Sequence, residues 1–250
     1  MKWDAELYET KHNYSSDYGK TLFDFLPPKS EAILDIGCGI GDLTERLKEC
    51  SDRVLGVDAS PDMIDLAKKK YPNVCFRLMD AEKLEFAEEY DVVFSNAAFH
   101  WILDQRRLLS GIFNALKPCG KLICEFGGAG NVARIRGAYQ NAANIEQDGR
   151  WFFPTEEEYR ELLSGSGFVP ESVALFDRPT PLGDGEKGLE NWIRQFYADD
   201  FGARSGDEQC AIMRKVTEKL RPTLFDSGKR QWIADYRRIR VVAGKGDNGG

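Results

Sequence analysis

Short apolar runs alternate with amphipathic stretches along the first half of the chain. The runs are rich in branched aliphatic and aromatic residues, which favours buried strands. They cover Ala32–Ile36, Arg53–Asp58, Val74–Leu78, Tyr90–Ser95 and Lys121–Phe126. Between them, apolar side chains recur every three or four positions, as in helices packed on a sheet. This alternation is typical of a parallel sheet with helices on both faces, so we predict an α/β, Rossmann-like, doubly wound fold.

Local signals mark the ends of several predicted helices. Ser60 can cap a helix that has Pro61 in its first turn, and the helical pattern stops before Pro72. Thr155 and Glu158 have the spacing of a capping box. We expect the other helices over Gly41–Glu49, Gln105–Lys117, Leu189–Phe201 and Glu208–Leu220.

The second half of the chain supplies the last predicted strands, Val169–Asp177 and Trp232–Ala243. We therefore predict a seven-stranded sheet with an antiparallel last strand and a helical insertion before it. In this prediction the whole chain, 1–250, forms a single domain. Its parts are an N-terminal flap or helix (1–30), the Rossmann-like core (31–178), a helical lid insertion (179–230), the final strand (231–244) and a disordered tail (245–250).

Composition narrows the possible partners. The chain has 250 residues and a formal net charge of −7, and this acidic balance disfavours a nucleic-acid partner. Met1–Tyr14 mixes charged and aromatic residues, unlike a signal peptide, and no apolar run reaches the length of a membrane helix. The six cysteines form no CxxC pair, and with only two histidines they disfavour a metal site. We expect reduced thiols and a cytoplasmic protein.

A glycine-rich turn, Gly37–Gly41, follows the first predicted strand. Glycines at such a turn let a ligand approach the backbone closely. The dinucleotide pattern GxGxxG would require glycine where Asp42 stands, which disfavours a nicotinamide dehydrogenase. Asp35 precedes the turn and would repel a pyrophosphate. It suits a ligand with an ammonium group and no phosphate, as in S-adenosylmethionine, although it could instead only cap backbone donors.

Two more carboxylates follow the next predicted strands. Asp58 ends the second strand, where it can accept hydrogen bonds from both ribose hydroxyls of an adenosine. Asp80 follows the third strand and can accept from an adenine amino group, and Met63 can pack on the adenine face. Each residue also has a simpler interpretation: Asp58 and Asp80 could be exposed turn residues, and Met63 could be a core residue. Because ligands of open α/β sheets bind at the carboxyl ends of the strands, we expect Asp35, Asp58 and Asp80 to converge.

Several segments together have the pattern of a known family. They are Ile33–Gly41, Val57–Met63, Met79–Glu82, Tyr90–Trp101 and Leu116–Gly120, with Cys119 where members often have glycine. They resemble the class I S-adenosylmethionine-dependent methyltransferases. A similarity to the trans-aconitate methyltransferase-like branch extends over nearly the whole chain. It rests on Ser95–Trp101, Glu125–Gly128, Trp151–Pro154, Phe176–Pro181 and the closing strand.

The resemblance implies methyl transfer from S-adenosylmethionine, with S-adenosylhomocysteine as product. The acceptor that the resemblance implies is a nucleophilic oxygen. The acceptor that it favours most is the carboxylate of a small, trans-aconitate-like polycarboxylic acid. The cofactor-binding residues it implies are Tyr14, Asp35, Gly37, Cys38, Gly39, Asp58, Ala59, Met63, Asp80, Ala81, Asn96 and Ala98. Among them, Asn96 and Ala98 would line the floor near the sulfonium, and the segment around Tyr14 would close over the cofactor.

The acceptor is expected beside the end of the fourth strand, where His100 and Trp101 lie. His100 can bind an anionic acceptor, act as a catalytic base for a less acidic one, or be purely structural. A carboxylate is already ionised at neutral pH and needs no base. His12, Arg134 and Arg178 come from segments that could border the acceptor, and their side chains could bind its carboxylates.

Two other functions remain open at this point. One is a methyltransferase that acts on a fatty-acyl carboxyl, a phenol or an amine, which would require an apolar and aromatic pocket in place of a basic one. The other is a protein that binds S-adenosylmethionine without transferring its methyl group. We expect a small-molecule acceptor, no nucleic-acid or membrane partner, and a monomer or homodimer.

Overall fold

The computed structural model describes residues 20–146 and 148–246. Its residues fall into two compact units. The first unit holds the described residues up to Ala129, together with Arg150–Leu175 and the chain from Arg238 onward. The second holds Gly130–Gly149 and Phe176–Arg237. It thus contains a segment, Gly130–Gly149, that lies outside the predicted lid insertion.

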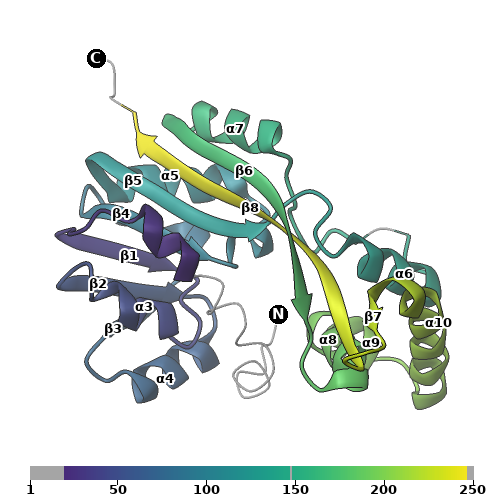
Figure 1. Cartoon of the computed structure of the whole chain (residues 1–250). Helices are drawn as coiled ribbons and strands as arrows, with labels where there is room; N and C mark the ends of the chain where they lie inside the picture. The colour runs from purple at the N-terminus through teal and green to yellow at the C-terminus, as the bar shows by residue number, and fades with distance from the viewer. Residues whose placement is uncertain (1–19, 147, 247–250) are drawn as a thin grey trace. The chain divides into compact units, whose positions relative to one another are not determined.

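The strands form a mixed sheet (Figure 1). They are β1 (Ala32–Ile36), β2 (Arg53–Asp58), β3 (Cys75–Leu78), β4 (Tyr90–Asn96), β5 (Leu116–Gly127), β6 (Phe168–Pro181), β7 (Phe225–Asp226) and β8 (Gln231–Lys245). Their order is β3-β2-β1-β4-β5-β8-β6, and the short β7 pairs with β8. Strands β1 to β5 pair in parallel, whereas β8 runs antiparallel to β5. The predicted α/β fold with an antiparallel last strand is confirmed, with the two-residue β7 as an addition.

In the first unit, helices cover both faces of the sheet. They are α3 (Asp42–Leu47), α4 (Pro61–Lys70), α5 (Gln105–Ala115) and α7 (Glu156–Gly165), together with the 3-10 helices η1 (Lys20–Phe25), η2 (Ala81–Lys83) and η3 (Phe99–Trp101). Side chains alternate along β1. Leu34 packs in the core cluster that holds α5 and α7, whereas Ile33 packs with Leu47 of α3. Every residue of β1 is therefore buried, as expected for a strand covered on both faces.

Several helix ends follow the sequence signals. Ser60 accepts a hydrogen bond from the Met63 N–H, and Thr155 forms a complete capping box with Glu158. Other boundaries differ from the prediction. Helix α5 ends at Ala115 because Leu116 already pairs with Tyr90. The ends of β6 and β8 also lie beyond the predicted ones, so Lys245 belongs to a strand and not to the predicted tail.

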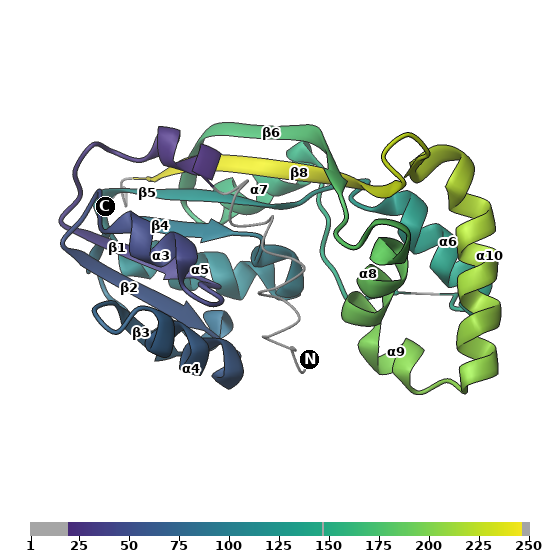
Figure 2. The ribbon, with the colours of Figure 1, turned by 60° about the horizontal axis from the view of Figure 1, so that its bottom comes forward.

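The second unit is mainly helical (Figure 2). Its helices are α6 (Ala133–Ala143), η4 (Gly185–Lys187), α8 (Gly188–Phe196), α9 (Ala198–Gly202) and α10 (Gly206–Leu224). The single helix predicted over Leu189–Phe201 is two helices, because the backbone leaves the helical region at Tyr197 (φ −119°, ψ 26°). Tyr139 of α6 packs on Tyr197, with ring centroids 4.0 Å apart. The sequence analysis assigned no helix to the region of α6.

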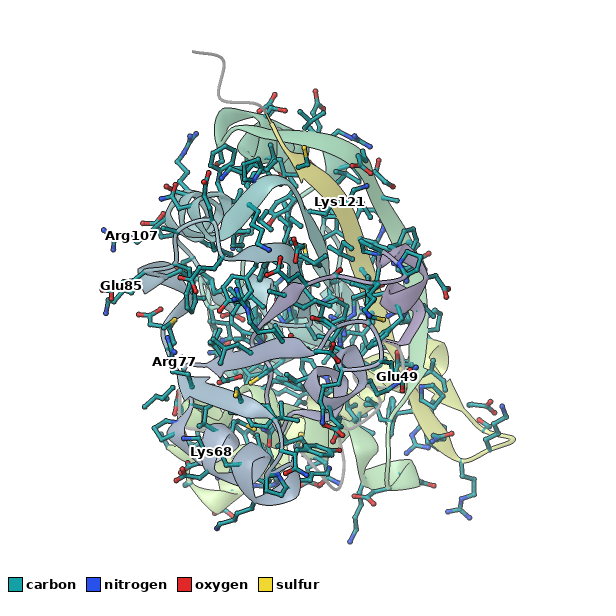
Figure 3. The ribbon with its side chains drawn as sticks, turned by 90° about the vertical axis from the view of Figure 1, so that its left-hand side faces the viewer. Glu49, Lys68, Arg77, Glu85, Arg107 and Lys121 are labelled. Carbon is teal, nitrogen blue, oxygen red and sulfur yellow. The ribbon has the colours of Figure 1, made fainter. Side chains whose placement is uncertain are left out.

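Charged side chains of both signs mix on the outside of the first unit. Figure 3 shows Arg77, Glu85 and Arg107 pointing outward along one side, and all three are exposed. Of the predicted N-terminal flap, the structure describes the part from Lys20 onward, which begins with η1. Among the described helices, none is both long and apolar enough to span a membrane. The lid role of the helical insertion stays a prediction.

Candidate functional site

A cavity of about 190 Å³ lies at the carboxyl ends of β1, β2, β3 and β4 in the first unit. Such a position is where open α/β sheets bind their ligands. Its lining comprises Ile36, Gly37, Gly39, Val57, Asp58, Ala59, Met63, Met79, Asp80, Ala81, Asn96, Ala97, Ala98, Trp101 and Ile102. Most of the predicted cofactor residues are thus brought together. The sequence analysis missed Ile36, Val57, Met79, Ala97 and Ile102, although the strand-end neighbours Ile36 and Val57 could have been found by the same reasoning.

The glycine turn is shaped by close packing. Gly37 has φ +73°, and a Cβ atom there would lie 2.2 Å from the Cβ of Ala98. No other residue fits without displacing the loop after β4. The Gly37 N–H donates to the Val57 carbonyl at 2.8 Å, which ties the turn to the end of β2. At Gly39 the space that a Cβ would occupy is open, so the backbone there can be approached.

Asp58 joins the cavity to the glycine turn. Its Oδ2 accepts from the Gly39 N–H at 3.0 Å, and its Oδ1 accepts from the Ser60 N–H at 2.8 Å. Burial raises the pKa of this carboxyl above its usual range, and hydrogen bonds from the backbone N–H groups of Ser60, Gly39 and Ala59 partly oppose that rise. Asp58 is therefore an oriented carboxylate with limited access to water, and it lines the cavity.

Asp35 takes a different position from Asp58. It is only 2% exposed and is not part of the described lining of the cavity. Its Oδ2 accepts a hydrogen bond from the Thr44 hydroxyl of α3 at 2.7 Å. Burial raises its pKa to about 7, the Thr44 hydrogen bond opposes this rise, and the negative charge of Asp58 adds to it. Asp35 thus connects β1 to α3, the helix that follows the glycine turn.

Asp80 lies at the rim of the cavity. Its side chain caps η2 by accepting from the Glu82 N–H at 3.0 Å, and it forms an exposed ion pair with Lys83 at 3.3 Å. Met63 of α4 and Ala81 of η2 also line the cavity. These residues give this end of the cavity an apolar wall with a carboxylate at its edge.

The end of β4 and the segment that follows it, through η3, add Asn96, Ala98 and Trp101 to the lining. His100 lies between them in the chain but is not among the described residues that line the cavity. It is 7% exposed, and its Nδ1 accepts from the Gly127 N–H at 3.3 Å. Burial, and next the charge of Arg238, lower the pKa of His100 well below its usual range. A cationic His100 that binds an anionic acceptor is not what this geometry favours.

The remaining predicted residues lie elsewhere. Arg134 and Arg178 belong to the second unit and are not among the described residues that line the cavity. Cys38 is partly buried and is not among the lining residues, and its N–H donates to the Val57 carbonyl. His12 and Tyr14 lie outside the described residues.

The chain also matches known proteins. A family described as a methyltransferase domain matches residues 33–120. An uncharacterized methyltransferase of Schizosaccharomyces pombe is 33% identical over 260 residues, which cover 97% of this chain and 98% of that protein. This chain belongs to the methyltransferase family.

Two relatives with named activities are also similar. A malonyl-[acyl-carrier protein] O-methyltransferase of Priestia megaterium is 35% identical over 214 residues, covering 80% of this chain and 76% of that protein. A trans-aconitate 2-methyltransferase of Deinococcus radiodurans is 29% identical over 259 residues, covering 97% and 98%. The resemblance to the trans-aconitate methyltransferase-like branch is confirmed.

Solved structures show the same fold. The YcgJ protein of Bacillus subtilis superposes with a TM-score of 0.66 at 17% identity, covering 95% of this chain and all of that one. A phosphoethanolamine N-methyltransferase of Haemonchus contortus, solved with S-adenosyl-L-methionine, superposes with a TM-score of 0.58 at 21% identity. That match covers 92% of this chain and 53% of the other.

Proposed function

We propose that this methyltransferase uses S-adenosylmethionine to methylate a carboxylate oxygen of a small-molecule acceptor. The observation that carries the proposal is the cavity at the carboxyl ends of β1 to β4, which combines a tightly packed glycine turn with the carboxylates of Asp58 and Asp80. Phosphate-free, hydroxyl-rich and cationic ligands suit such a lining, because a carboxylate accepts hydrogen bonds and attracts positive charge.

The residues that line the cavity fit S-adenosylmethionine. Asp58 would accept hydrogen bonds from the ribose hydroxyls, because its orientation is already fixed by Gly39 and Ser60. Met63 and the neighbouring apolar lining would pack on the adenine, with Asp80 at the edge of the ring. When bound, the cofactor supplies an electrophilic methyl group on a sulfonium sulfur. The chain's part is to align the acceptor with that methyl and to exclude water.

The acceptor is proposed to be a carboxylate, in the manner of a trans-aconitate-like acid. Support comes from the relatives named as O-methyltransferases of malonyl-[acyl-carrier protein] and as trans-aconitate methyltransferases. A carboxylate is ionised at neutral pH, so this reaction needs no general base. His100 is not among the described lining residues, and burial lowers the pKa of its imidazole well below the usual range, which makes it a weak base and agrees with a mechanism that has none. A cytoplasmic location is proposed as well, since all six cysteines are free thiols.

Methyl transfer can be tested directly with methyl-labelled S-adenosylmethionine and a panel of acceptors. The panel contains trans-aconitate, saturated tricarboxylates, free fatty acids, phenols and amines. We expect label in a small-acid product that mild base releases as methanol, the behaviour of a methyl ester. Base-stable label would instead assign the transfer to a phenol, an amine or carbon. Cofactor binding without transfer to any acceptor would contradict the proposed activity.

A further inference from the structure

His100 occupies the short η3 helix, between two residues that line the cavity, Ala98 and Trp101. Its Nδ1 lies 3.3 Å from the backbone nitrogen of Gly127 at the end of β5. A backbone N–H can only donate, so Nδ1 must carry a lone pair and the single ring proton must sit on Nε2. The bond therefore requires a neutral imidazole.

The surroundings keep the ring in that state. His100 is 7% exposed, and β8 places Arg238 directly opposite Gly127 in the antiparallel pair with β5. Burial and the nearby guanidinium both lower the pKa of the imidazole. The Gly127 N–H is itself buried, and a buried backbone donor without an acceptor costs free energy. The hydrogen bond thus satisfies a group that would otherwise destabilise the end of β5.

His100 also connects a third segment to the site. Its backbone carbonyl accepts from the Phe152 N–H at 2.9 Å. Its ring lies 5.3 Å from the ring of Trp101 and 5.7 Å from that of Phe153, and Trp101 packs on Trp151 at 5.5 Å. The lining residue Trp101 therefore packs against an aromatic cluster that contains His100, Trp151 and Phe153.

We propose that His100 is a positioning residue whose Nδ1 ties η3 to the end of β5 and thereby holds Trp101 in the wall of the cavity. The inference rests on the proposed function, since it assigns the role of one residue in the cofactor and acceptor site. A positioning role differs from a catalytic role in a way that can be tested. A positioning role needs only a hydrogen-bond acceptor at the place of Nδ1, and the ring transfers no proton.

Two substitutions separate these roles. His100→Asn keeps an acceptor, because its Oδ1 is attached to Cγ as Nδ1 is, but it removes most of the ring. His100→Phe keeps the ring and removes the acceptor. Trp101→Phe and the double variant His100→Phe/Trp101→Phe report whether the two residues act together. Ser51→Ala is the matched control. The Ser51 hydroxyl also accepts a hydrogen bond from a backbone N–H, that of Arg53 at 3.2 Å, but it does so at the start of β2, at the amino ends of the parallel strands.

The measurements are the dissociation constant for S-adenosylmethionine by titration calorimetry, KM and kcat for methyl transfer, and the melting temperature. We expect His100→Phe to weaken cofactor binding or raise KM about tenfold. The dissociation constant and KM of His100→Asn should stay within about threefold of the parent values. The double variant should have the same constants as Trp101→Phe alone. Ser51→Ala should lower only the melting temperature.

Loss of kcat in both His100 variants with unchanged affinities would overturn the proposal in favour of a catalytic histidine. Changes in melting temperature alone would overturn it in favour of a purely structural one. Failure of the parent protein to bind S-adenosylmethionine would remove the proposed function and this inference together.

Discussion

Asp35 is a carboxylate that the fold keeps away from water. It lies in the fully buried strand β1, and its side chain accepts a hydrogen bond from the Thr44 hydroxyl at 2.7 Å. Its pKa of about 7 means that ionisation in the folded protein is costly. Such a group is retained at the expense of stability, and a positively charged ligand nearby would offset that cost.

Replacement of Asp35 by Asn tests this view. Between the usual pKa of 3.8 and about 7, the folded protein keeps the Asp35 proton that the unfolded chain has lost. The stability of the ligand-free protein should therefore fall as pH rises through this window and then level off. Asp35→Asn should remove that slope and raise stability at pH 8 by about 1–3 kcal/mol, while weakening cofactor binding. Thermal melts of both proteins from pH 4 to 8 measure it, and an unstabilised variant at pH 8 would contradict the account.

Gly37 gives a second prediction at the residue scale. A Cβ at this position would meet Ala98 at 2.2 Å, and the residue has a positive φ of +73°. Gly37→Ala should lower stability by about 2 kcal/mol or more and abolish cofactor binding, because the glycine turn or the β4 loop must move. Gly202→Ala is the control, since nothing lies within 4 Å of its Cβ position. Calorimetric titration and thermal melts check both variants, and normal binding by Gly37→Ala would be the contrary result.

At the scale of elements, the sequence was most informative where a local signal acts alone. The capping box of α7 and the Ser60 cap of α4 appear where they were predicted, because a cap needs only residues within one turn. The end of α5 was predicted too late. Pro118 and Gly120 resemble a helix stop, but Leu116 already pairs with Tyr90 of β4. That pairing depends on a distant strand, which local signals do not report.

The cap of α7 should contribute to stability but not to binding. Thr155 accepts from the Glu158 N–H, and Glu158 in turn accepts from the Thr155 N–H at 2.7 Å. The helix carries Tyr159 and Leu163 into the core. Thr155→Ala should lower the free energy of unfolding by about 1 kcal/mol and leave the S-adenosylmethionine affinity unchanged. Urea unfolding and calorimetry measure the two quantities. A marked loss of affinity would show that α7 acts on the cavity.

At the scale of the whole molecule, topology explains which site residues could be predicted. Asp58 and Asp80 follow neighbouring parallel strands, so their convergence on one edge follows from the fold class alone. Side-chain alternation was the overlooked signal for Asp35. Leu34 and Ile36 face the cluster of α5, so Asp35 faces α3 and meets Thr44. Arg134 and Arg178 were assigned to the acceptor from sequence segments alone, and the structure places both in the second unit.

The central claim is that the cavity at the ends of β1 to β4 binds S-adenosylmethionine, and one calorimetric titration tests it most directly. S-adenosylmethionine is titrated into the parent protein, Asp58→Ala and the control Asp65→Ala, which changes an exposed aspartate of α4. We expect binding to the parent and to Asp65→Ala with equal affinity, and a loss of at least about tenfold in Asp58→Ala, since charged hydrogen bonds contribute about 1.5–3 kcal/mol each. Equal affinity in all three proteins, or none in the parent, would contradict the account.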